Sequence, residues 1–121
     1  MAGAERLICS SDGLTDSGDG VRFELEVDGR LEPAFVVRFN GRVYAYLNRC
    51  AHMPMELDWK PRKFFDAEGL LLICSTHGAV YRPDTGRCLG GPCFDGGLTP
   101  VPVEERDGKV FLKEGGNGGK R

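Results

Sequence analysis

The chain has 121 residues, enough for one domain with its own hydrophobic core and too few for two full domains. The chain has 16 Lys and Arg residues and 18 Asp and Glu residues, and the resulting formal charge of −2 argues against a nucleic-acid-binding protein. The 18 glycines and 7 prolines favour turns and short strands over long helices. Composition therefore argues against a helical bundle.

The apolar runs and the N-terminus indicate where the protein works. No apolar run approaches the roughly 18 residues that cross a membrane as a helix. Residues 1–6 lack the basic start and the apolar stretch of a secretory signal. We therefore expect a cytoplasmic protein that has no membrane partner and no nucleic-acid partner.

The N-terminal half of the chain predicts four strands. Residues 7–9 are a short apolar segment that fits an edge strand. Residues 21–27 alternate apolar and charged side chains, which is the period of a strand with one buried face. The side chains expected on that face are Val21, Phe23, Leu25 and Val27. Residues 35–39 and 43–47 are apolar runs around Asn40-Gly41, a pair that accepts positive φ at both positions, so we expect a tight hairpin.

Shorter strands are expected in the middle of the chain. The continuous apolar run at residues 70–73 predicts a buried strand that leads directly into Cys74. Residues 79–81 predict another strand, which ends at a turn over residues 82–86 with a proline early and a glycine last.

The C-terminal part predicts one more hairpin and then a tail. Residues 101–103 and 109–112 are apolar segments on either side of Asp107-Gly108, a turn signal. We expect a single antiparallel β domain over residues 1–114 and a flexible, glycine-rich tail over residues 115–121.

Five cysteines and only two histidines are present, and each histidine lies close to a cysteine. The two pairs are Cys50-Ala51-His52 and Cys74-Ser75-Thr76-His77. In a reducing compartment such pairs indicate a metal site sooner than a disulfide framework. Two thiolates and two imidazoles suit a tetrahedral zinc ion or an iron–sulfur centre. Because each loop supplies one ligand of each kind, a binuclear iron–sulfur cluster is favoured over a zinc finger.

At these residues the chain resembles the Rieske iron–sulfur family. The resemblance rests on the two Cys/His loops, on residues 43–48 before the first loop and on Gly91-Pro92-Cys93, and it covers broadly residues 21–112. It implies a small antiparallel β domain with two cluster-binding loops and a third, Pro-containing loop that covers the cluster. It also implies one 2Fe-2S cluster. The ligands it implies are Cys50 and Cys74 on one iron and His52 and His77 on the other.

The chain departs from the membrane-bound members of that family. Met55 and Thr76 stand where respiratory members carry two cysteines that form a disulfide, and we expect no N-terminal membrane anchor. The segment between His52 and Cys74 is a few residues longer than in most members. The resemblance is therefore to ferredoxins and to the Rieske domains of aromatic-ring oxygenases. We expect no room for the second, mononuclear-iron domain of an oxygenase.

The resemblance implies an electron carrier that is not a stand-alone catalyst. It would be a ferredoxin that takes one electron from a flavin reductase and passes it to an oxygenase. The alternatives are a cluster-based redox-sensing or regulatory subunit and a non-redox zinc module. We expect a monomer or weak oligomer that docks through the loop tips. The tip residues expected in that contact are His52, Met53, Pro54, His77 and Gly78, with Pro92 at the rim.

Two residues after the second loop bear on the reduction potential. High-potential members of the family place a serine two residues after the second histidine, where its hydroxyl bonds to a bridging sulfide, and here that position is Ala79. Tyr81 matches a tyrosine that bonds to a ligand sulfur in the family and raises the potential. The absence of the serine and of the inter-loop disulfide leads us to expect a midpoint below about +50 mV, in the low half of the Rieske range.

Other cysteines and an aromatic, basic stretch admit more than one interpretation. Cys88 and Cys93 could bond to each other, bind metal or stay free, and we favour free thiols because thiols pack as small apolar groups. Cys9 is expected to be structural. Residues 59–66 mix aromatic and basic side chains, and in a net acidic chain we favour a packed loop with solvated charges over a nucleic-acid patch.

Overall fold

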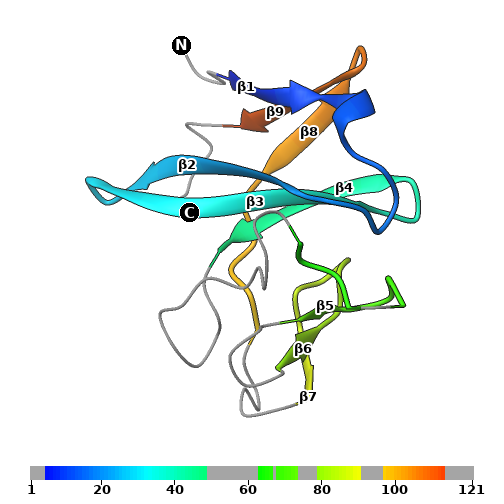
Figure 1. Ribbon diagram of the computed structural model, residues 1–121. Coiled ribbons are helices and arrows are strands. Elements are labelled where there is room, and N and C mark those ends of the chain that lie inside the picture. The colour runs from blue at the N-terminus through cyan, green and yellow to red at the C-terminus, as the bar shows by residue number, and fades with distance from the viewer. Residues whose placement is uncertain (1–4, 49–62, 67, 74–78, 91–96, 114–121) are drawn as a thin grey trace.

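The computed structural model describes residues 5–48, 63–66, 68–73, 79–90 and 97–113. Over these residues the chain forms three antiparallel sheets of three strands each and one 3-10 turn, Ser11–Gly13. In Figure 1 the sheet β2-β3-β4 lies between the other two sheets. The prediction of an all-β, antiparallel fold is confirmed.

The middle sheet is a meander of β2 (Val21–Val27), β3 (Arg30–Phe39) and β4 (Arg42–Leu47). Exposure alternates along β2 as its sequence period predicts. The β3–β4 hairpin turns at Asn40 and Gly41, whose φ angles are 53° and 81°. Both positions need the left-handed region that an Asn-Gly pair tolerates, so the predicted hairpin is confirmed.

The second sheet has the order β1-β9-β8, with β1 (Glu5–Ser10), β8 (Val103–Arg106) and β9 (Lys109–Lys113). The predicted edge strand and last hairpin are both present. The predicted start of that hairpin at Val101 is wrong by two residues, because the Val101 N–H is bonded to the carbonyl of Ala45 on β4 at 2.9 Å. Residue 101 thus lies against the middle sheet before the chain reaches β8.

Each face of the middle sheet covers its own core. Ala34, Phe35, Val36 and Val37 are all fully buried, which is the pattern of a strand that is covered on both faces. The core shared with the β1-β9-β8 sheet consists of Leu14, Val36, Ala45, Val101, Val110 and Leu112. The core on the opposite face consists of Phe35, Val37, Tyr46, Phe64, Phe65, Leu72, Ala79, Tyr81 and Leu98.

The third sheet is small and consists of β5 (Leu72–Ile73), β6 (Val80–Tyr81) and β7 (Cys88–Gly90). Strand β7 was not predicted. The apolar run at 70–73 is only partly a strand, because Leu70 lies in the preceding turn and is 57% exposed. Within the described ranges, no helix is long and apolar enough to cross a membrane.

Candidate metal centre

All four predicted ligands, Cys50, His52, Cys74 and His77, lie outside the described residues. The structure does describe the strands on either side of them. Strand β4 ends at Leu47, three residues before Cys50. Strand β5 ends at Ile73, directly before Cys74, and β6 begins at Val80, three residues after His77.

The second ligand loop is closed by a strand pair. Ile73 and Val80 are partners in the antiparallel β5–β6 ladder. Neighbouring strands lie about 4.8 Å apart, so Ile73 and Val80 are held near each other. The two predicted ligands Cys74 and His77 both belong to the segment that joins these partners in sequence.

The start of the first ligand loop is held by two backbone bonds. The Leu47 N–H donates to the Thr99 carbonyl at 2.9 Å, and the Asn48 N–H donates to the Pro33 carbonyl at 2.8 Å. Asn48 is the buried polar residue of the described chain, with 1% of its surface exposed. The two bonds fix the path of the chain two residues before Cys50.

Aromatic packing fixes the small sheet against the middle sheet. The Phe64 ring stacks on Phe35 of β3 with centroids 4.1 Å apart and planes 11° apart. The Phe64 carbonyl accepts the Ile73 N–H at 3.0 Å, so the same residue holds the end of β5. Phe64 and Phe65 are 0% and 6% exposed, and for these residues the packed interpretation of the aromatic, basic stretch is confirmed.

Tyr46 forms a second tie between the two sheets. Its buried hydroxyl donates to the Pro83 carbonyl at 2.8 Å, in the turn that follows β6. Burial raises the pKa of this phenol above its ordinary value, so it stays protonated and able to donate. Gly86 has φ +77°, and a Cβ there would lie 2.7 Å from Tyr46 Cε1. The sequence marked Gly86 only as a turn residue and gave no signal for its contact with Tyr46.

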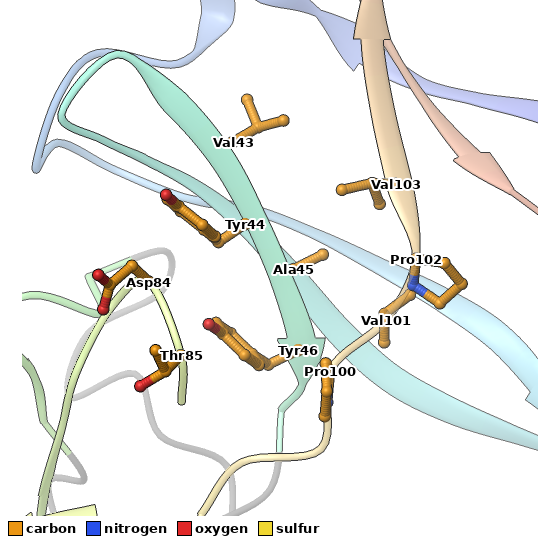
Figure 2. A pocket seen from close by; sticks show the side chains of 10 residues that line it. All are labelled: Val43, Tyr44, Ala45, Tyr46, Asp84, Thr85, Pro100, Val101, Pro102 and Val103. Atoms are coloured by element: carbon orange, nitrogen blue, oxygen red, sulfur yellow. The ribbon is translucent and has the colours of Figure 1, made fainter. Parts of the chain in front are cut away.

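The space beside this tie is a shallow cavity of about 400 Å³ (Figure 2). Its lining residues are Val43, Tyr44, Ala45, Tyr46, Asp84, Thr85, Pro100, Val101, Pro102 and Val103. The Asp84 carboxylate is engaged by Arg82, and the Tyr46 hydroxyl by Pro83. The cavity has a mixed polar and apolar lining and contains no predicted metal ligand.

The two residues predicted to set the reduction potential are both buried. Ala79 and Tyr81 are 0% exposed and belong to the core that carries the small sheet. The predicted bond from Tyr81 would reach a ligand that lies outside the described residues. That bond stays a prediction.

One of the remaining cysteines differs from expectation. Cys88 is disulfide-bonded, so the prediction of a free thiol at this position is wrong. Cys88 sits at the start of β7 and is partly packed against the aromatic core. Cys93 and the Pro loop lie outside the described residues, as do the loop-tip residues Met53, Pro54 and Gly78. Cys9 is a free thiol whose pKa is raised by burial, in agreement with a structural role.

The donor chemistry of the two loops fits one cofactor. Two thiolates and two imidazoles, one of each from each loop, are the ligand set of a Rieske 2Fe-2S centre. Among the described residues, no group of three or more His, Cys, Asp and Glu side chains could hold a metal ion. The donor set of the two Cys/His loops therefore fits a 2Fe-2S cluster.

Comparisons with known structures agree with this reading. The ferredoxin of carbazole 1,9a-dioxygenase from Nocardioides aromaticivorans IC177 is 27% identical, with a TM-score of 0.66, over 90% of this chain and 96% of that chain. The Sphingomonas yanoikuyae B1 ferredoxin is similar in fold, with 21% identity and a TM-score of 0.67 over 92% of this chain and 99% of that chain.

The terminal oxygenase of the Nocardioides system also shares the fold, with 22% identity and a TM-score of 0.71, but the match covers 30% of that chain and 92% of this one. No curated protein matches the sequence. The similarity to that ferredoxin runs along nearly the whole of both chains, and the family match supports the predicted 2Fe-2S cluster. A family model, the Rieske [2Fe-2S] domain, matches residues 6–105. The chain belongs to the Rieske [2Fe-2S] domain family.

Proposed function

We propose that this protein is the ferredoxin component of a Rieske oxygenase system. It receives one electron at a time from a flavin reductase and delivers each one to a terminal oxygenase. The observation that carries the proposal is the match to 96% of a dioxygenase ferredoxin, against 30% of a terminal oxygenase chain. In length the chain therefore corresponds to the whole of the ferredoxin, whereas it corresponds to only one part of the oxygenase chain.

We further propose the ligand assignment within this site. Cys50 and Cys74 bind one iron, and His52 and His77 bind the other. When bound, the cluster supplies a centre that accepts and releases one electron. The contribution of the chain is to hold both loops on a rigid base. The Phe35–Phe64 stack supports this, because it joins the strand that leads into Cys74 to the middle sheet.

The ligand assignment is tested by iron and sulfide analysis of the purified protein. The wild type is expected to contain two irons and two acid-labile sulfides per chain and to show a Rieske-type EPR signal when reduced. His77→Ala is expected to lose the cluster or that signal. Cys9→Ser is the matched control, because Cys9 is a free thiol on β1, and it should leave both unchanged. Stoichiometric zinc without labile sulfide would refute the assignment.

The role is tested in a reconstituted reaction. NADH, a flavin reductase, the wild-type protein and the terminal oxygenase of the Nocardioides carbazole 1,9a-dioxygenase are mixed, and carbazole oxidation is measured against the concentration of this protein. We expect oxidation to require the protein and to saturate with it. In parallel, the reductase and the protein alone should reduce cytochrome c. Cytochrome c reduction without any carbazole oxidation would contradict the role as an oxygenase ferredoxin.

A further inference from the structure

The loop before β2, residues 14–20, is tied to the chain segment that leads toward the second ligand loop. The Lys63 ammonium pairs with the Asp19 carboxylate at 2.6 Å, but the two side chains are 46% and 41% exposed, so solvent screens the pair. The neighbouring contact, between Gly20 and Phe64, is buried on both sides. The buried contact therefore decides how closely the two segments approach each other.

Gly20 leaves just enough room for the Phe64 ring. A Cβ at residue 20 would lie 2.7 and 2.8 Å from Cδ2 and Cε2 of Phe64 and 2.9 Å from Val37 Cγ1. Ordinary contacts begin at 3.4 Å, so the ring is about 0.7 Å too close for a methyl group. Gly20 does not have a positive φ angle. Alanine at this position would therefore add bulk without backbone strain.

Phe64 is the neighbour that gives way to such a methyl group. Val37 lies in β3, the central strand of the middle sheet, which is hydrogen-bonded on both sides, and its branched side chain is stiff at χ1. Phe64 lies outside the named strands, beside an isolated bridge between Phe65 and Leu72. An added methyl group at residue 20 would therefore displace Phe64 before it displaced β3.

The backbone passes a displacement of Phe64 to the end of β5. The Phe64 carbonyl accepts the Ile73 N–H at 3.0 Å, and Ile73 directly precedes Cys74 in the sequence. The Asp66 N–H donates to the Leu71 carbonyl at 2.9 Å in the same pairing, so β5 follows this segment. Functional groups have to be held within about 0.5 Å of their working geometry, and a shift of about 0.7 Å at the ring is large on that scale.

We propose that Gly20 is a positioning residue for the cluster, because the space it leaves seats Phe64 and thereby places Cys74. This inference rests on the ligand assignment proposed above. Hydrogen bonds to the sulfurs help to set the reduction potential of such a centre. A Cys74 that moves away from its donors loses part of their stabilisation of the reduced state, so the potential should fall.

Voltammetry and EPR of Gly20→Ala test the proposal. We expect the equilibrium constant for reduction to fall about threefold, the effect of weakening one hydrogen bond, which is about 28 mV for one electron. The g-values of the reduced protein should shift as well. Gly13→Ala is the matched control, because a Cβ at residue 13 would meet nothing within 4 Å, and it should change neither quantity.

A second control separates positioning from loss of stability. Glu105 pairs with Arg38 at 2.5 Å on the opposite side of the middle sheet, so Glu105→Gln should lower Tm at an unchanged midpoint potential and unchanged g-values. A merely structural role for Gly20 would give Gly20→Ala the same behaviour as Glu105→Gln. That result would overturn the proposal.

Phe64→Leu tests the path from residue 20 to the cluster. Leucine is smaller than phenylalanine and leaves room for a methyl group at residue 20. Adding Gly20→Ala to Phe64→Leu should therefore shift the midpoint less than adding it to the wild type. Equal shifts in the two backgrounds would overturn the path. If Gly20→Ala alone does not fold, the double variant should fold again and show the visible absorption of the cluster, and its failure to do so would also overturn the path.

The outcomes distinguish this inference from the ligand assignment. A wild type with stoichiometric zinc and no labile sulfide would refute the assignment, and the role of Gly20 would fail with it. A wild type with the Rieske-type signal, next to a Gly20→Ala variant with the same g-values and an unchanged or higher midpoint, would overturn the role of Gly20 alone.

Discussion

Removing the charge of Glu105 is expected to destabilise the protein at neutral pH and to matter less in acid. Glu105 on β8 pairs with Arg38 on β3, and the guanidinium binds both carboxylate oxygens, at 3.1 and 2.5 Å. Arg38 also donates to the carbonyls of Leu14, Gly41 and Ser11. The two side chains are 14% and 25% exposed, so solvent screens the pair only in part.

The magnitude follows from these bonds. Charge-assisted hydrogen bonds contribute about 1.5–3 kcal/mol, against about 1 kcal/mol for neutral ones. Glu105→Gln keeps the shape and one neutral bond but leaves the Arg38 charge without its counterion. We expect a loss of about 1–2 kcal/mol, which lowers Tm by roughly 4–8 °C for a domain of this size.

The pH dependence has a definite sign. The hydrogen bonds from Arg38 lower the pKa of Glu105 below its ordinary value of 4.5. A carboxyl whose pKa is lower in the folded state stabilises the fold fully above its unfolded pKa, and this contribution is lost as the pH falls through the folded pKa. The Tm gap between wild type and Glu105→Gln should be constant from pH 7 to about pH 5.5 and narrow below about pH 4.5.

Circular dichroism melts of wild type, Glu105→Gln and Glu104→Gln measure this gap. Glu104 is the neighbouring residue on the same strand, and its pairs with Arg106 at 3.5 Å and Lys113 at 3.6 Å are exposed. Such surface pairs contribute little, about 0–1 kcal/mol, so Glu104→Gln should barely shift Tm. A Glu105→Gln shift no larger than that of Glu104→Gln, or a gap that stays constant into acid, would show that the ion pair does not work as argued.

Two further predictions concern the small sheet. Tyr46→Phe should cost about 1–2 kcal/mol, measured as a lower Tm, because the Pro83 carbonyl loses a buried donor. Tyr44→Phe is the control and should change Tm little, because no hydrogen bond of its hydroxyl is seen within the described residues. Equal shifts in Tm would contradict the role of the Tyr46–Pro83 bond. For the reduction potential we expect a wild-type midpoint below about +50 mV, a higher value in Ala79→Ser and a lower value in Tyr81→Phe, since donors to sulfur favour the reduced state. Protein-film voltammetry near neutral pH decides this, and a wild-type midpoint above about +150 mV would show that the argument from Ala79 is wrong.

Local patterns predicted the elements whose conformation is decided locally. The alternation of β2 and the Asn40-Gly41 turn depend on neighbours in the sequence, and both are present. The ligand set suggested by the two Cys/His pairs stays a prediction, and the family match supports a 2Fe-2S cluster in this chain. Strand β3 begins at Arg30, earlier than predicted, because residues 30–34 pair with β2 and are extended by that pairing. The charged residues and Pro33 in this segment give it no strand pattern in the sequence.

The features that the sequence did not predict are those that depend on contacts between distant residues. Strand β7 is three residues long and contains a bulge, so no period of two develops in its sequence, and it exists because β6 pairs with it. Leu70 belongs to a run of four apolar residues, but the backbone bond between Asp66 and Gly69 turns the chain there and leaves Leu70 exposed.

The arrangement of these contacts separates stability from electron transfer. The Arg38–Glu105 pair joins β3 to β8, in the part of the fold built on the β1-β9-β8 sheet. The Phe35–Phe64 stack and the Tyr46–Pro83 bond join the opposite face of the middle sheet to the small sheet. Because the two sets share no side chain, changes at Glu105 should alter Tm without altering the midpoint potential or the KM for the oxygenase. Measuring Tm and the midpoint potential on the same Glu105 variants tests whether folding and electron transfer are independent in this protein.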